Sequence, residues 1–292
     1  MSSESLRDVT PDPTPRPERR WLPGFLFVTT FLTTTSAGAI QQGVNLLKQP
    51  MGIFQGLPFS ITLMGILMVH EMSHYLASRS HKVPSTLPFF IPAPSIIGTF
   101  GAVIRMKGAI WDRRALLDIG ASGPIGGFLL ALPALIVGLT MSKVVPGGNG
   151  EGGIILGDSL LMLLLERFVL GDLPINADLI LHPVAFAGWI GMFVTSLNLL
   201  PVGQLDGGHI AMALFPDCFN IIARVVHIGL LAMGVFFWEG WLIWALLLVF
   251  IGVRHPPVLL PQISLDDRRR KIGYCALAIF VLTFVPAPFS IL

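Results

Sequence analysis

The chain has 292 residues, of which 53% are hydrophobic and only 12% are charged, and its formal net charge at pH 7 is +2. Soluble domains carry about 25% charged residues, so this composition excludes an ordinary soluble protein and indicates a polytopic membrane protein with the lipid bilayer as a partner. Two cysteines are too few for a disulfide framework, and no basic stripe interleaved with aromatic residues points to a nucleic-acid partner.

Residues 1–20 are polar and rich in proline, which predicts a disordered cytoplasmic tail in front of a single transmembrane domain at 21–292. A membrane span needs roughly 20 apolar residues. Seven segments meet or approach this length, and they are Leu22–Ile40, Leu57–Ser78, Leu116–Met141, Pro183–Leu200, Ile221–Trp238, Trp241–Val253 and Ile272–Leu292. We therefore expect an all-α polytopic membrane protein with about seven transmembrane helices.

The second span contains an HExxH pattern at His70–His74. Two histidines four residues apart lie on the same helix face, where both imidazoles can reach one Zn²⁺ with Glu71 beside it. Ionisable side chains at this depth are costly and are usually functional. The pattern predicts a metal site inside a membrane helix.

The segment between the second and third spans lacks a helical pattern, because prolines interrupt it. Its second half, Ile96–Lys107, alternates and is rich in β-branched residues, which predicts one or two strands. Backbone groups in lipid must be satisfied internally. We therefore expect a small membrane-associated β element at the cytoplasmic face, buried in protein or lining a wet cavity.

The third span begins near Asp118 and continues with small residues at Gly120–Gly127, which allow another helix to approach closely. The later segment Ile154–Leu170 is apolar but carries three charged residues, and we expect an interfacial or re-entrant helix on the outer side.

The distribution of basic residues predicts the orientation of the spans. With seven spans and a cytoplasmic N-terminus, the inner side holds four Lys or Arg residues before the first span, six after the second, one after the fourth and five before the seventh, which is 16 of the 19. If Ile154–Leu170 also crossed the membrane, the inner side would hold only 11.

A catalytic zinc ion usually has three protein ligands and one position for water, so the two histidines need a third partner. The fourth span ends near Asn198 and leads through a break in the helix to Asp206, on the same inner side as His70–His74. We favour Asp206, since a broken helix end with flanking glycines can present a carboxylate inward. Asp118 and His209 lie on that side too and remain alternatives.

These residue types predict peptide hydrolysis. Glu71 is placed to take a proton from water and to pass it to the leaving amine. The substrate must be extended, because a helix hides its carbonyl groups in hydrogen bonds. We expect the strand near Phe100 and Gly101 to pair with such a substrate as an added strand, and the amide of Asn198 to hold its backbone.

Three features of the chain resemble the site-2 protease family of intramembrane zinc metalloproteases. They are the HExxH pattern at His70–His74, Gly98–Gly101 followed by Ser122–Pro124, and an N-x-x-P-x-x-x-x-D-G pattern at Asn198–Gly207. The resemblance covers about Leu57–Leu214.

The resemblance implies that His70, His74 and Asp206 bind one zinc ion per chain and that Glu71 is catalytic. It also implies regulated intramembrane proteolysis, in which single-span membrane protein substrates are cleaved in or near their transmembrane segments. We expect a multi-pass protein of the bacterial inner membrane, with the active site towards the cytoplasm and the C-terminus outside. Many bacterial members of that family insert a PDZ domain and some carry a C-terminal CBS domain. We expect neither here, because the outer segment leaves little room for the first and the chain ends in a predicted span.

Three other interpretations stay open, and the simplest is that the HExxH pattern merely lines a polar interface between helices. A non-catalytic zinc-binding membrane transporter or chaperone-like protein could keep the metal site, although it would have no use for Glu71. An unrelated membrane zinc peptidase could take a glutamate as its third ligand, although Glu151, Glu166 and Glu239 are all assigned to the outer side.

Overall fold

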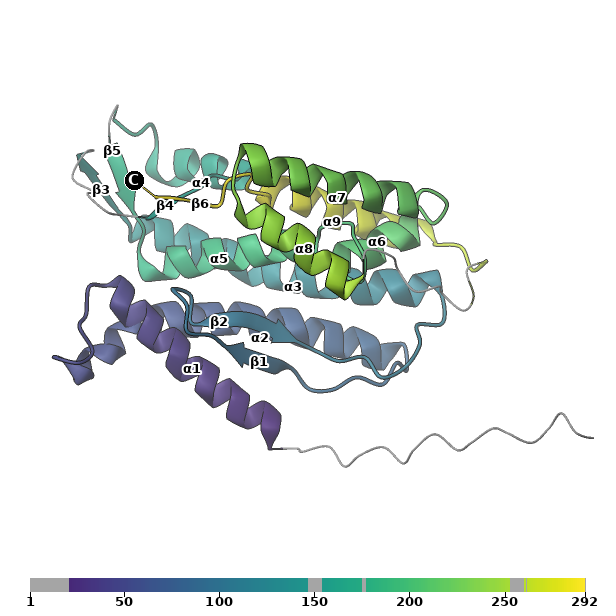
Figure 1. Ribbon diagram of the computed structural model, residues 1–292, viewed down its shortest axis with the longest axis horizontal. Helices are drawn as coiled ribbons and strands as arrows, with labels where there is room; N and C mark the ends of the chain where they lie inside the picture. The colour runs from purple at the N-terminus through teal and green to yellow at the C-terminus, as the bar shows by residue number, and fades with distance from the viewer. Residues whose placement is uncertain (1–20, 147–153, 175–176, 253–259, 261, 292) are drawn as a thin grey trace, which may run out of the picture.

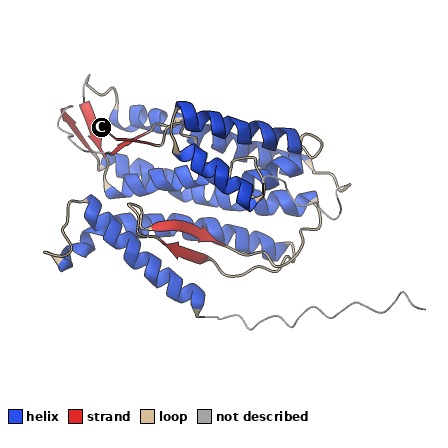
Figure 2. Cartoon of the chain, in the orientation of Figure 1, coloured by secondary structure: helices blue, strands red, loops and turns tan. Residues whose placement is uncertain are grey.

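The computed structural model describes residues 21–146, 154–174, 177–252, 260 and 262–291. The tail predicted at residues 1–20 lies outside this part of the chain. Helices dominate the described residues, as Figure 1 and Figure 2 show. In chain order they are α1 Leu22–Gln41, the 3₁₀ helix η1 Pro50–Gly56, α2 Leu57–Ser80, α3 Arg113–Thr140, α4 Leu160–Leu170, α5 Pro183–Asn198, α6 Asp206–Leu214, α7 Phe219–Phe236, α8 Gly240–Ile251 and α9 Asp267–Thr283.

Four of the described helical segments are long and apolar enough to cross a membrane: α1, η1 with α2, α3 and α7. The predicted fourth, sixth and seventh spans coincide with α5, α8 and α9, which have 16, 12 and 17 residues, so seven spans are not confirmed. The predicted seventh span, Ile272–Leu292, is wrong at its C-terminal end, because the helix α9 stops at Thr283. Pro286 and Pro288 follow, and a proline disfavours helical backbone in the residue before it.

Helix α3 is central and packs against α2, α5, α6 and α9 (Figure 1). It begins after Asp112, whose carboxylate accepts a hydrogen bond from the N–H of Ala115 and so caps the first turn. Near its other end, Gly138 lies so close to Ala185 of α5 that a Cβ atom would overlap the backbone. Glycine therefore permits the close crossing of α3 and α5.

The predicted β element is present: β2, Thr99–Val103, lies within the predicted segment Ile96–Lys107. It pairs antiparallel with β1, Phe89–Pro92, which lies outside that segment and was not predicted. Hydrogen bonds from α1 fix where the hairpin lies. Thr33 Oγ1 donates to the carbonyl of Gly98 at 2.7 Å, and the last residue of α1, Gln41, donates to the carbonyl of Ile96 at 2.6 Å. These bonds hold the hairpin alongside α1, so its tip points away from the end of α2 (Figure 1).

Two further strand pairs lie at one end of the bundle, where α3 ends and α5 begins. Strand β3, Lys143–Pro146, pairs with β5, Ala177–Ile180, and β4, Ile154–Leu156, pairs with β6, Phe289–Ile291. We call this the outer end (Figure 2). The inner end is the opposite one, where α2 ends and both α3 and α9 begin.

Helix α4 lies at the outer end between β4 and β5 in the chain. It begins after Ser159, whose hydroxyl accepts a hydrogen bond from the N–H of Met162. Helix α4 has 11 residues and is not among the described helices that are long and apolar enough to cross a membrane, which agrees with the prediction that Ile154–Leu170 does not span.

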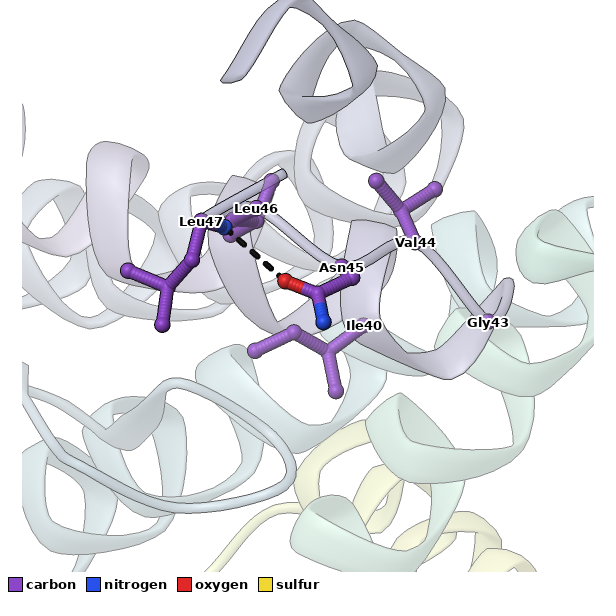
Figure 3. A pocket seen from close by; sticks show the side chains of 6 residues that line it. All are labelled: Ile40, Gly43, Val44, Asn45, Leu46 and Leu47. Atoms are coloured by element: carbon purple, nitrogen blue, oxygen red, sulfur yellow. Dashed lines mark hydrogen bonds between the residues drawn. The ribbon is translucent and has the colours of Figure 1, made fainter. Parts of the chain in front are cut away.

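A shallow pocket is present at the turn after α1 (Figure 3). Its lining residues come from one short segment and none of them is titratable, so their side chains offer no acid or base. They are Ile40, Gly43, Val44, Asn45, Leu46 and Leu47.

Candidate metal centre

His70 and His74 lie on one face of α2, both buried, with their Nε2 atoms 3.2 Å apart. The neighbouring face of α3 has glycines where the imidazoles need space. A Cβ atom at Gly123 would overlap the ring of His74, and one at Gly127 would lie 3.0 Å from His70 Nδ1. The small residues predicted to allow close helix contact therefore serve this site.

Asp206 reaches the same place from the first turn of α6. Its Oδ2 atom lies 3.3 Å from His70 Nε2 and 3.2 Å from His74 Nε2. The next residue, Gly207, packs so tightly on the turn after α5 that a Cβ atom would overlap the carbonyl of Leu199. The glycine thus lets the helix start close enough for the carboxylate to point inward.

These three side chains form a group that could hold a metal ion. Among the described residues, no other cluster of His, Cys, Asp or Glu side chains meets this geometry. Ligand atoms about 2.0–2.1 Å from a tetrahedral zinc ion lie about 3.3 Å from one another. The separations among His70, His74 and Asp206 are 3.2–3.3 Å. Two imidazole nitrogens and one carboxylate oxygen are also a donor set that suits zinc.

The orientation of His74 is set by a backbone group. Its Nδ1 lies 2.8 Å from the carbonyl oxygen of Ile119 on α3. A carbonyl can only accept, so Nδ1 carries the proton and Nε2 keeps its lone pair towards the site. Sequence reasoning missed Ile119 because a backbone carbonyl has no signature in the side-chain pattern.

The two alternative third ligands lie elsewhere. The carboxylate of Asp118 accepts hydrogen bonds from His81 and Arg269, and His209 is not grouped with the two histidines of the pattern. Glu166 belongs to α4 at the outer end. Of the two other glutamates considered, Glu239 precedes α8 and Glu151 lies outside the described residues.

Glu71 is buried beside the metal group and its carboxylate accepts a hydrogen bond from the backbone of Ile104. Ile104 directly follows β2, so the end of this strand lies next to the predicted general base. Asn198 is also at the site, with its amide nitrogen 3.3 Å from His70 Nε2. The structure therefore brings together five of the seven predicted site residues.

The remaining two, Phe100 and Gly101, lie on β2 a few residues before Ile104. The Phe100 side chain is 76% exposed. The N–H of Gly101 is engaged by the hydroxyl of Thr99 at 2.9 Å, and its φ angle of 101° breaks the strand regularity. A substrate strand could therefore contact the exposed ring of Phe100, but it could not accept a hydrogen bond from the N–H of Gly101, which already bonds to Thr99.

Comparison with known proteins identifies the family to which this chain belongs. The model of peptidase family M50, to which the site-2 proteases belong, matches residues 58–238. The match confirms the resemblance inferred from the sequence.

The curated relatives include three plant proteins. Probable zinc metalloprotease EGY2, chloroplastic, from Arabidopsis thaliana is 30% identical over 80% of this chain and 42% of its own length. Probable zinc metalloprotease EGY1, chloroplastic, from Arabidopsis thaliana is 32% identical over 79% of this chain and 43% of its own length. The EGY1 protein of Oryza sativa subsp. japonica is 33% identical over 79% of this chain and 40% of its own length. The chain spans less than half the length of these relatives. No solved structure matches it.

Proposed function

This chain belongs to peptidase family M50, and from this premise we propose that it is an intramembrane zinc metalloprotease that hydrolyses peptide bonds in or near transmembrane segments. The observation that carries the proposal is the convergence of His70, His74 and Asp206 around one point, with Glu71 buried beside it. A transporter or chaperone-like protein would need the metal group but not this carboxylate.

We assign the three converging side chains as ligands of one zinc ion per chain. Bound there, zinc supplies Lewis acidity, which polarises the scissile carbonyl and acidifies water. Replacing Asp206 by Ala should strongly reduce zinc content, while His209→Ala should not. Zinc retention by Asp206→Ala at the parent level would remove Asp206 from the ligand set.

Glu71 is the proposed general base and acid. As the water oxygen attacks the carbonyl carbon, the Glu71 carboxylate takes the water proton and then delivers it to the amine nitrogen as the C–N bond breaks. The proposed role of Asn198, whose amide nitrogen lies 3.3 Å from His70 Nε2, is to hold the substrate backbone.

The proposed substrate is a single-span membrane protein that unwinds and extends along the hairpin. Within the described residues β2 is paired only with β1, and it ends beside Glu71. An extended segment added to β2 beyond the irregularity at Gly101 would therefore lead its carbonyls towards the metal group.

We further propose that α5, α8 and α9 complete seven spans, with the inner end in the cytoplasm of a bacterial cell and the C-terminus outside. The excess of basic residues at the inner end supports this orientation. Helix α9 connects the two ends, because Arg269 bonds to Asp118 and β6 pairs with β4.

Cysteine labelling tests the orientation. In a variant with both Cys218 and Cys275 replaced by Ser, a membrane-impermeant maleimide on intact cells should label Lys48→Cys and spare Lys82→Cys. The opposite labelling would reverse the assignment.

The decisive test of the function compares the parent protein with Glu71→Gln in vesicles that contain a tagged single-span substrate. We expect the variant to keep its zinc and to lose roughly 100-fold or more in cleavage rate. Equal cleavage by the two proteins would falsify the mechanism. Full zinc occupancy without cleavage by the parent would favour the non-catalytic interpretation.

A further inference from the structure

Asp118 joins three helices at the inner end. It lies in the second turn of α3, and its Oδ2 atom is 2.9 Å from Nε2 of His81, the C-cap residue that follows α2. The same oxygen is 2.8 Å from Nη2 of Arg269 on α9, whose Nε also donates to both carboxylate oxygens. One carboxylate therefore receives hydrogen bonds from the helix on either side of α3.

The guanidinium of Arg269 forms ion pairs with two carboxylates. Besides its bonds to Asp118, its Nη1 bonds to the carboxylate of Asp266. The side chains of His81, Asp118 and Arg269 are 22–29% exposed. Partly exposed ion pairs contribute little to global stability, so stabilisation alone does not account for a group with this many well-directed bonds.

The residue after Asp118 is Ile119, whose carbonyl accepts the Nδ1 proton of His74. One turn later, Gly123 packs against the other side of the same imidazole, where a Cβ atom would overlap it. The His74 ring is thus confined between two fixed points of α3, so a small slide of α3 along α2 would either break the bond to Ile119 or push Gly123 into the ring.

Other contacts at the start of α3 do not control this register. Arg113 donates to the carbonyl of Ala213 on α6, and Arg114 donates to the carbonyl of Ser264 in the segment before α9. Neither bond reaches α2. The Asp118 carboxylate does, through His81.

We propose that Asp118, held by Arg269 and His81, is a positioning residue that sets the register of α3 against α2 and thereby the orientation of His74 at the metal centre. The inference rests on the proposed assignment of His74 as a zinc ligand. It predicts that a residue outside the metal group controls how long the metal stays bound.

The test measures zinc release from the purified full-length protein to a chromogenic chelator, for the parent, Asp118→Asn and Arg269→Gln. We expect both variants to release zinc roughly 10-fold faster or more, as when a partner that orients a metal ligand is removed. Arg269→Lys should restore part of the difference, because it keeps a cation near Asp118. Arg270→Gln is the matched control, which removes the same charge from the neighbouring position, and it should release zinc at the parent rate.

A second readout separates positioning from general loosening. The double variant, Asp118→Asn with Arg269→Gln, should release zinc no faster than the faster-releasing of the two single variants, because both changes remove one contact. The visible spectrum of the Co²⁺-substituted protein should shift in Arg269→Gln and not in Arg270→Gln. Parent-like release and spectrum in folded Arg269→Gln, or equal acceleration in Arg270→Gln, would overturn the proposal even if Asp118→Asn failed to fold.

The outcome is independent of cleavage. A parent protein that holds zinc but cleaves no substrate would contradict the proposed function and leave the release rates to decide this inference. A parent protein that retains no zinc would overturn both.

Discussion

Helices α3 and α7 have the same mean hydropathy, 1.8, over their most apolar windows, but their surroundings differ. In α3, 39% of that window is buried inside the protein, against 22% in α7. Three glycines of α3 face the HExxH turn of α2, whereas a Cβ atom at Gly229 of α7 would meet open space. Hydropathy shows that both helices suit a membrane, and the small residues at defined contacts show which one supports the site.

The difference also concerns what each contact must achieve. Between α2 and α3, ring atoms of His70 and His74 have to lie at fixed separations, so backbone and side chain meet without space to adjust. Along α7, exposed residues such as Val235 and Phe236, at 70% and 80%, need only be apolar. The close contacts that fix the positions of the two imidazoles are therefore those between α2 and α3.

The largest expected effect comes from adding a methyl group to a glycine of α3, and the same change in α7 is its control. In Gly123→Ala the new Cβ atom overlaps the His74 ring, and we expect zinc content and cleavage to fall roughly 100-fold. Gly229→Ala makes the same chemical change in open space, and it should leave both unchanged while adding about 0.5–1 kcal/mol of helix stability. Zinc analysis and the cleavage assay check the pair. Similar zinc contents in the two variants would show that α3 does not confine the imidazole.

Much of the site could be predicted because it rests on local periodicity and on sidedness. The helical repeat places His70 and His74 on one face, and the orientation of the spans brings Asp206 to the same end. The ion pair between Asp118 and Arg269 was not predicted, although both residues were assigned to the inner side. Knowing that Asp118 lies at the inner end limits its possible partners to the cations of that end, but it does not say which of them forms the ion pair.

The direction of the β hairpin could not be predicted for a different reason. Alternation identifies β2, but a strand pattern does not say which helix the strand accompanies. The bonds from Thr33 and Gln41 to the hairpin tip join residues that are 65 and 55 positions apart. The pairing of β4 with β6 is more distant still and involves three residues on each side, too few to produce a pattern.

An intermediate effect is expected where the substrate meets the hairpin. Truncating the exposed ring in Phe100→Ala should raise the KM for a single-span substrate roughly 10-fold and leave kcat largely unchanged, because a buried phenyl contact contributes about 1.5–3 kcal/mol. Phe168 on α4 is 86% exposed at the outer end and is the matched control, for which KM should not change. If both variants shifted KM equally, the effect would reflect general lipid exposure and β2 would lose its proposed role.

The smallest expected effect concerns the stability of the outer end. Burial, with a further contribution from the charge of Asp158, raises the pKa of Glu166 from its ordinary value of 4.5 to about 7. The folded protein then binds more protons than the unfolded chain between these values, so stability falls as pH rises from 4.5 to 7 and stays low above it. Glu166→Gln removes this penalty. Because the side chain is partly exposed, we expect a gain of about 1 kcal/mol at pH 8, or about 2–4 °C in Tm, and none near pH 4. Thermal unfolding of both proteins at the two pH values measures the difference. A gain of equal size at both pH values would mean that the carboxylate charge is not its cause, and that the outer end, like α7, responds to side-chain polarity alone.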